Sequence, residues 1–208
     1  IFYKIFLFFL IDHVMVLTFT PVIMLNIILK RPDNSNKLVV LVHGSGVSWW
    51  QWLIAMTYLK IKNINYMCVK YDYRKPLSDT KQSVIDQIPS NKNIILIGQS
   101  MGGLMVRLIA NDVKAEKIFL LNTPQKGSPL IDWIFPKEDN KVYIKRYEQM
   151  RYNCDFIKNL PEFSGNTYVI VGMNDFVRPS QSIHFGKNVY YSWFGHSFAA
   201  ANPYLWFT

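Results

Sequence analysis

Short, mostly apolar runs recur along the chain from residue 38 onward, each bounded by polar or turn-forming residues. Runs of this length and apolar character are typical of β-strands that are buried on both faces of a parallel sheet. We therefore predict six strands, at Leu38–Val42, Tyr66–Tyr71, Asn93–Ile97, Lys117–Leu121, Thr167–Val171 and Asn188–Trp193.

Stretches with the periodicity of helices lie between several of these runs. After residue 101, the side chains of Leu104, Met105, Leu108 and Ile109 follow the i, i+3, i+4 spacing of an amphipathic helix. Weaker helical patterns occur in three other stretches. The predicted helices are therefore Trp49–Leu59, Ser78–Ile88, Met101–Asn111 and Phe198–Leu205. The alternation of strands and helices predicts an α/β fold, with a mostly parallel central sheet and helices on both of its faces.

Residues 1–31 form an apolar N-terminal segment of a different kind. Ile5–Leu29 is long enough to span a membrane, because a spanning helix needs roughly 20 apolar residues. Such a helix would contain four polar or helix-breaking positions, Asp12, His13, Pro21 and Asn26. Two interpretations stay open. One is a membrane anchor or uncleaved signal segment, with a membrane-associated or secretory location, and the other is a pair of strands at the sheet edge of a cytoplasmic protein.

One α/β catalytic domain over residues 32–208 follows from the length of 208 residues, which allows one core and little more. The alternating pattern breaks between residues 127 and 166, in a mixed segment of which part is predicted to be helical. Its aromatic side chains are Trp133, Phe135, Tyr143, Tyr147, Tyr152 and Phe156.

Composition and charge narrow the range of partners. Half of the residues are hydrophobic and 15% are aromatic, which excludes a disordered chain. The formal net charge of +9 is spread along the chain without a basic block or nucleic-acid motif. We therefore predict a solvated basic surface and no nucleic-acid partner, with an anionic membrane surface as the second option. Cys68 and Cys154 are predicted to be ordinary thiols, with a single bridge as the alternative, and their spacing indicates no metal site.

The segment Gly98–Gly103, with the sequence GQSMGG, joins a predicted strand to the most regular predicted helix. A serine in this context lies at a sharp turn that exposes its hydroxyl group at the edge of the sheet. Such a turn needs small residues at Gly98 and Gly102, because side chains there would collide with the neighbouring strand and helix. Ser100 is the predicted nucleophile.

A second glycine-rich segment, His43-Gly44-Ser45-Gly46, follows the first predicted strand. The carboxyl ends of parallel strands share one edge of the sheet, so this loop is expected beside Ser100. We predict an oxyanion hole formed by the backbone N–H groups of Ser45 and Met101. His43 is expected to brace the loop rather than to act as a base.

The acid and the base of a serine nucleophile are expected later in the chain. Asp175 follows a predicted strand directly, and His196 follows the last one, which matches the order serine, acid, histidine. The competing acids are Asp132, Asp139 and Asp155, in the irregular segment. His184 is a competing base, but it lies in a stretch with a helical pattern and is expected to be a surface or packing histidine.

These motifs together resemble the α/β-hydrolase superfamily, and within it the lipase and esterase branch. The resemblance runs from about Lys37 to Ala200 and includes a third motif, Asn122–Pro129, with the sequence NTPQKGSP. It implies an eight-stranded sheet, a cap after the strand that follows the nucleophile helix, no metal and no organic cofactor. The cap would be residues 127–166, whose aromatic side chains would suit an apolar acyl chain. The alternative is that these side chains pack against the main core. Two features depart from the pattern: the clear strands number six, and Gln99 stands where the lipase motif commonly has histidine.

The resemblance implies hydrolysis of carboxylic esters, including lipid esters, through an acyl-serine intermediate. The substrate would be a small-molecule acyl ester or a lipid, and the sequence leaves the oligomeric state open. Thioester hydrolysis and acyl transfer would use the same serine and differ only in the substrate or acceptor admitted. A binding protein that kept the fold without catalysis is a third hypothesis, from a different functional class.

Overall fold

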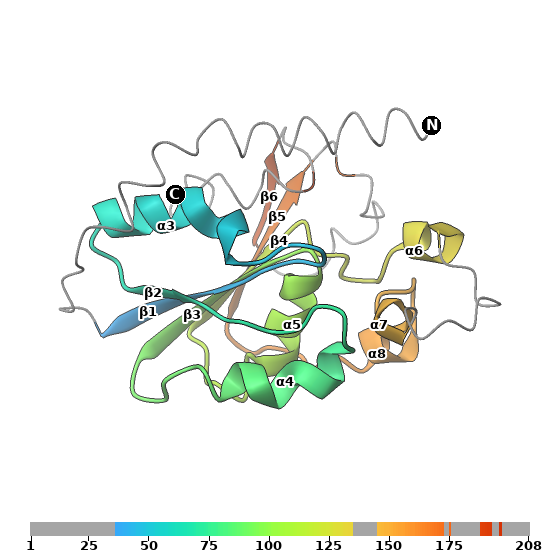
Figure 1. Cartoon of the computed structure of the whole chain (residues 1–208), viewed down its shortest axis with the longest axis horizontal. Coiled ribbons are helices and arrows are strands. Elements are labelled where there is room, and N and C mark those ends of the chain that lie inside the picture. Colours follow the sequence, from blue (N-terminus) through green and yellow to red (C-terminus); the bar gives the residue numbers. More distant parts are fainter. Residues whose placement is uncertain (1–35, 135–144, 173–174, 176–187, 193–195, 197–208) are drawn as a thin grey trace.

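The computed structural model describes residues 36–134, 145–172, 175, 188–192 and 196. Six parallel strands form one sheet in the order β2-β1-β3-β4-β5-β6 (Figure 1). Their bounds are β1 Lys37–Val42, β2 Tyr66–Cys68, β3 Asn93–Gln99, β4 Lys117–Leu121, β5 Asn166–Gly172 and β6 Asn188–Ser192. All six predicted strands are thus confirmed. The two further strands that the resemblance implies are not among the described residues, and the N-terminal apolar segment, one place where they are expected, lies outside them.

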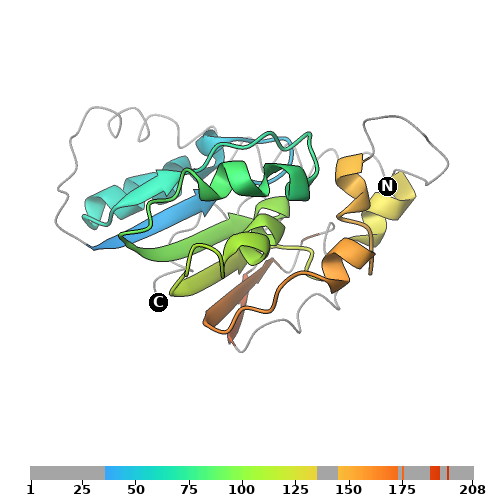
Figure 2. The ribbon, with the colours of Figure 1, turned by 90° about the horizontal axis from the view of Figure 1, so that it is seen from below.

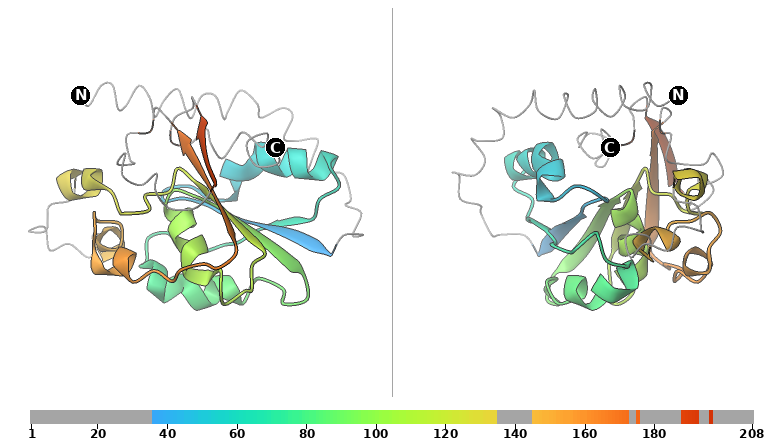
Figure 3. Two further views of the ribbon diagram at one scale, coloured as in Figure 1. Left: turned by 180° about the vertical axis from the view of Figure 1, so that it is seen from behind. Right: turned by 45° about the vertical axis from the view of Figure 1, so that its right-hand side comes forward.

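Helices cover both faces of this sheet, as the sequence predicts. The 3₁₀ helix η1 (Trp49–Trp52) and helix α3 (Leu53–Ile61) lie on one face, while α4 (Leu77–Ile85) and α5 (Met101–Ile109) lie on the other (Figures 1 and 3). The predicted helix from Trp49 therefore begins as a 3₁₀ turn. The predicted helix Phe198–Leu205 and the apolar segment 1–31 lie outside the described residues.

Strand β1 explains why the central strands are apolar throughout. Leu38, Val40 and Val42 belong to the core cluster that includes α5, whereas Val39 and Leu41 belong to the cluster on the α3 side. Successive side chains of a strand point to opposite faces, and here both faces are covered by helices. Burial on both faces leaves no position in the strand centre for a polar side chain.

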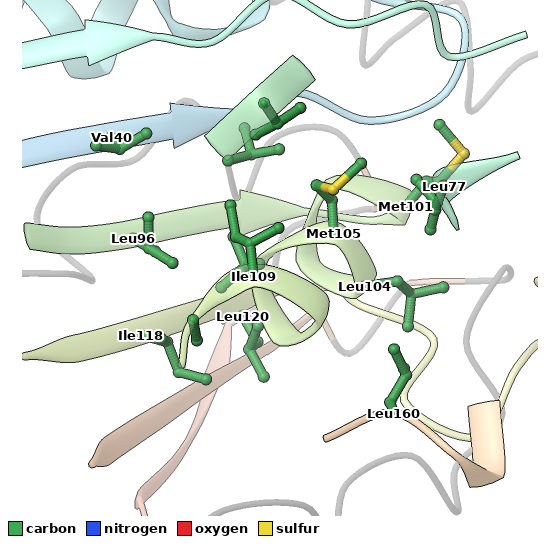
Figure 4. Packing of buried hydrophobic residues seen from close by; sticks show 14 of the residues in the cluster. Val40, Leu77, Leu96, Met101, Leu104, Met105, Ile109, Ile118, Leu120 and Leu160 are labelled. Carbon is green, nitrogen blue, oxygen red and sulfur yellow. The ribbon is translucent and has the colours of Figure 1, made fainter. Parts of the chain in front are cut away.

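Helix α5 contributes the largest share of one core layer. Its side chains Leu104, Met105 and Ile109 are fully buried, and Figure 4 shows them in one core cluster that also contains Leu96, Leu120 and Leu160. The amphipathic pattern of the sequence therefore places the apolar side of α5 on the sheet.

Two leucines of α5 test this arrangement. Leu104 is fully buried, whereas Leu108 is only partly buried against the same cluster. We expect Leu104→Ala to lower the free energy of unfolding by about 3 kcal/mol, through lost burial and the cavity left behind. Leu108→Ala, the matched control, should cost less than half as much. Urea unfolding would measure both, and equal losses would contradict the packing described.

Strand β2 is shorter than the sequence predicts. The apolar run continues to Tyr71, but the strand ends at Cys68. The N–H of Lys70 donates to the side-chain oxygen of Gln87 (2.8 Å), and the amide nitrogen of Gln87 donates back to the carbonyl of Lys70 (2.8 Å). A side chain from beyond α4 thus satisfies the backbone groups of Lys70, two residues after the end of β2. Helix α4 itself ends at Ile85, earlier than predicted.

Three short helices follow β4 within the irregular segment. They are α6 (Pro129–Ile134), α7 (Lys145–Glu148) and α8 (Asp155–Lys158), and they lie together at one end of the sheet (Figures 1 and 2). Four aliphatic side chains here join the core cluster of α5, namely Ile131, Met150, Ile157 and Leu160. Tyr147 and Phe156 pack against that cluster while partly buried. This part of the segment therefore extends the core, and a cap function for residues 127–166 stays a prediction.

Three further findings concern the described residues. Cys68 and Cys154 are both free thiols, so the alternative of a bridge between them is wrong. Within the described ranges, no cluster of three or more His, Cys, Asp or Glu side chains is arranged to hold a metal ion. In the same part of the chain, every helix is too short or too polar to cross a membrane.

Candidate active site

The candidate site lies where the strand order changes direction. The chain passes from β1 outward to β2 and then returns to β3 on the other side of β1. The loops after β1 and β3 therefore separate at this point, which in open parallel sheets is the usual position of a ligand crevice. Val42 and Gly98 are paired in register, so His43 and Ser100 follow neighbouring strand ends.

Ser100 stands in the tight turn between β3 and α5. Its backbone has φ 54° and ψ −124°, a conformation that costs a side-chain-bearing residue about 1–3 kcal/mol. The N–H of Ser100 donates to the carbonyl of Leu121 in β4 (2.9 Å), which helps to hold the turn. The turn is strained, as the sequence predicts.

The two glycines of the turn are needed for steric reasons. A methyl group on Gly98 would lie 2.7 Å from the Cα atom of Gly103. A methyl group on Gly102 would overlap the backbone oxygens of Val42 and His43. Helix α5 can therefore approach both β3 and the end of β1 only because neither glycine carries a side chain, and the predicted collisions are confirmed.

Gly102→Ala tests this close approach. Because the added methyl group meets backbone atoms, which cannot rotate away, we expect a loss of about 3 kcal/mol in the free energy of unfolding. Gly46→Ala is the matched control: Gly46 has φ 77° but open space around its Cα, so only the conformational cost of about 1–2 kcal/mol applies. Thermal unfolding of the two variants would compare them, and a Gly102→Ala variant as stable as Gly46→Ala would contradict the packing.

Asp175, His196 and Ser100 are joined by two hydrogen bonds. His196 Nδ1 lies 2.8 Å from Asp175 Oδ2, and His196 Nε2 lies 2.8 Å from Ser100 Oγ. The Asp175 side chain is fully buried and that of His196 is 15% exposed. An ionised carboxylate can only accept, so the imidazole proton lies on Nδ1 and Nε2 accepts from the serine hydroxyl. This arrangement can take a proton from Ser100 while holding the imidazole in one orientation.

The competing acids are engaged elsewhere or exposed. Asp132 Oδ1 lies 2.9 Å from Nη1 of the buried Arg151, and the side chain of Asp155 is 94% exposed and 3.9 Å from Lys158. Both carboxylates thus have roles at the surface of the irregular segment, as expected for solvated or structural groups. Asp139 and His184 lie outside the described residues.

His43 packs within its loop. Its Nδ1 donates to the carbonyl of Gly44 (2.9 Å), and its ring stacks on the ring of Tyr71 with centroids 4.4 Å apart. The hydroxyl of Tyr71 in turn donates to the carbonyl of His43. Burial lowers the pKa of His43 below its usual value, which favours the neutral imidazole. These contacts are those of a bracing residue.

The backbone donors near Ser100 differ in their availability. The N–H of Gly44 donates to the side-chain oxygen of Gln51 (3.2 Å) and is therefore occupied. Ser45 follows in a turn, and Met101 is the first residue of α5, where a helix leaves its N–H groups without intrahelical acceptors. The assignment of Ser45 and Met101 as oxyanion donors stays a prediction.

A pocket of about 300 Å³ opens beside the His43 loop. It is lined by residues from the loops after β1 and β2, which are His43, Val47, Ser48, Tyr71, Asp72, Tyr73 and Arg74. The aromatic rings and Val47 make part of this lining apolar, and Asp72 and Arg74 form an ion pair at its exposed side. Trp49 is 44% exposed, whereas Trp52 is buried in the core cluster under α3.

Three polar residues at this edge were not assigned a role from the sequence. Gln51, Gln99 and Asn122 are all buried, and each has a side-chain hydrogen bond to a residue in another part of the chain. The position of Asn122 directly after β4, at the same edge as Ser100, is a signal that could have identified it. Gln51 has no such signal, because it lies within the helical stretch after β1.

Comparisons with known proteins identify the fold. No protein-family model matches the chain, and no curated protein matches it significantly. Among solved structures, a lipase of Bacillus licheniformis in its mature form is 16% identical, with a TM-score of 0.64 over 86% of this chain and 92% of that one. The tetrameric haloalkane dehalogenase of Paraglaciecola agarilytica is 16% identical, with a TM-score of 0.63 over 85% and 83%. An α/β-hydrolase enzyme from the metagenome of lagoon sediments at Mar Chica, Morocco, is 15% identical, with a TM-score of 0.61 over 84% and 88%. The chain therefore has the α/β-hydrolase fold that its motifs predict.

Proposed function

We propose that this chain of α/β-hydrolase fold is a serine hydrolase that cleaves carboxylic esters through an acyl-Ser100 intermediate. The observation that carries the proposal is the unbroken hydrogen-bonded line from Asp175 through His196 to Ser100. Its serine stands at a strained turn between a parallel strand and a helix, where its hydroxyl group lies at the sheet edge. The lipase among the structural neighbours supports hydrolase chemistry on this fold.

In the first half of the reaction, Ser100 attacks the acyl carbon of the ester. His196 Nε2 takes the hydroxyl proton as the Oγ–C bond forms, and Asp175 stabilises the imidazolium ion. The oxyanion of the tetrahedral intermediate would be held by the N–H groups of Ser45 and Met101, each contributing about 3 kcal/mol to the transition state. The C–O bond of the ester then breaks, and the leaving alkoxide receives the proton from His196.

Water completes the reaction by the reverse sequence. His196 Nε2 takes a proton from the water molecule, whose oxygen attacks the acyl carbon of acyl-Ser100. Collapse of the second tetrahedral intermediate breaks the bond to Oγ and returns the proton to Ser100, so a carboxylic acid is released. A thiol leaving group or an alcohol acceptor would use the same steps, which makes thioester hydrolysis and acyl transfer the alternatives on this site.

The proposal is tested with a fluorophosphonate probe, which labels an activated serine covalently. We expect the folded wild type to be labelled and to hydrolyse p-nitrophenyl acetate, butyrate and octanoate. Matched thioesters, and an added alcohol acceptor, would then separate the ester, thioester and transfer activities. An absence of labelling and of hydrolysis, both with and without detergent or lipid vesicles, would favour the non-catalytic binding protein instead.

A further inference from the structure

The backbone carbonyl of His196 accepts two side-chain hydrogen bonds. Gln99 Nε2 donates to it over 2.9 Å, and Asn122 Nδ2 donates over 2.9 Å. Gln99 is the last residue of β3, whereas Asn122 directly follows β4. Two donors that come from different strands and meet at one oxygen atom restrict its position more than either donor alone.

Each of the two donors is anchored at its other end. Gln99 Oε1 accepts from Gln51 Nε2 (2.9 Å), and Gln51 Oε1 accepts from the N–H of Gly44 (3.2 Å). Asn122 Oδ1 accepts from the N–H of Gly172 at the end of β5. Because an amide side chain donates at one end and accepts at the other, these partners determine which end faces His196.

Burial makes these amide bonds costly to break. Gln51 is 6% exposed, Gln99 3% and Asn122 1%, so water cannot readily replace a lost partner. Asn122 also has φ 47°, a backbone conformation that asparagine tolerates better than most residues. The N–H of Asp175 donates to the carbonyl of Gly172 (3.2 Å), so Asn122 contacts both the residue of the base and the strand end that leads to the acid.

We infer that Gln99 and Asn122 are positioning residues that keep the imidazole of His196 in line with Ser100, an inference that rests on the proposed function. The carbonyl group and the imidazole belong to one residue, so a displaced carbonyl also displaces Nε2 from Ser100 Oγ. Loops hold such groups less firmly than strands do. The two amides connect this loop residue to the ends of two central strands.

The test compares Gln99→Met, Asn122→Gly and the double variant with the wild type. Methionine keeps the length of glutamine without its amide, and glycine tolerates the positive φ of Asn122. We expect each single variant to lower both kcat for p-nitrophenyl acetate and the rate of fluorophosphonate labelling by about 3- to 10-fold. The double variant should lower both by about 100-fold, the loss that follows when a catalytic group is misplaced by about 1 Å. KM should change by less than about 2-fold, because a displaced base slows the chemical step without removing substrate contacts.

Gln87→Met is the matched control. Its amide also bridges backbone groups, those of Lys70 and Ser83, but it does not contact His196, so kcat should stay at the wild-type value. A folded double variant with wild-type kcat would overturn the inference, as would a raised KM at unchanged kcat. If the double variant does not fold, equal kcat values for Gln99→Met and Gln87→Met would overturn it. A wild type without labelling at Ser100 would overturn the proposed function and this inference together.

Discussion

Ser100→Ala is expected to lower kcat/KM for p-nitrophenyl esters by about 10⁴- to 10⁶-fold and to abolish fluorophosphonate labelling. The hydroxyl oxygen of Ser100 is the attacking atom. Among the described residues, it is the side-chain hydroxyl that lies within hydrogen-bonding distance of His196 Nε2. Ser83→Ala is the matched control, since Ser83 is an exposed residue of α4 and should leave both activities unchanged. Unchanged ester hydrolysis by folded Ser100→Ala would overturn the proposed function.

The same position allows a second measurement, of stability. Glycine adopts φ 54° without the steric cost that serine bears. Ser100→Gly should therefore be inactive and yet more stable than Ser100→Ala, by about 1 kcal/mol in the free energy of unfolding. An inactive Ser100→Gly variant with unchanged or higher stability would show that activity is lost with the hydroxyl group and not through unfolding.

Asp175→Asn is expected to lower kcat by about 10⁴-fold while the protein stays folded. The carboxylate accepts from His196 Nδ1–H and so leaves the lone pair on Nε2 facing Ser100. An asparagine amide can instead donate to Nδ1, which moves the imidazole proton to Nε2 and removes the base.

Asp155→Asn gives the matched control for this exchange. The Asp155 side chain is 94% exposed, so the same loss of charge should leave kcat unchanged. Steady-state kinetics of both variants, together with their melting temperatures, would check the prediction. If Asp175→Asn retained wild-type kcat, Asp175 could not be the orienting acid, and Asp139 would be the next candidate to replace.

Most of the fold follows from local patterns in the sequence. The central strands are apolar along their length because both of their faces are covered, as β1 shows with Val40 on one side and Leu41 on the other. Where an element meets a non-local partner, the local pattern was less accurate. Strand β2 ends at Cys68 although the apolar run continues to Tyr71, and the backbone of Lys70 is bonded by the side chain of Gln87, 17 positions away. No periodicity within residues 66–71 contains that contact.

The sequence by itself determined the strand and helix order, the strained turn at Ser100 and the need for glycine at position 98, because each depends on residues close together in the chain. The motif also predicts glycine at position 102, but the reason there is tertiary, because a methyl group would meet the backbone oxygens of Val42 and His43. Only the tertiary structure shows that His196 contacts both Asp175 and Ser100, which lie 21 and 96 positions from it in the sequence. It also decided that Gln99 and Asn122 share one carbonyl, over separations of 97 and 74 positions. The physical reason is that a side-chain hydrogen bond depends on distance and direction in space, and strand order rather than sequence spacing brings these loops to one edge of the sheet.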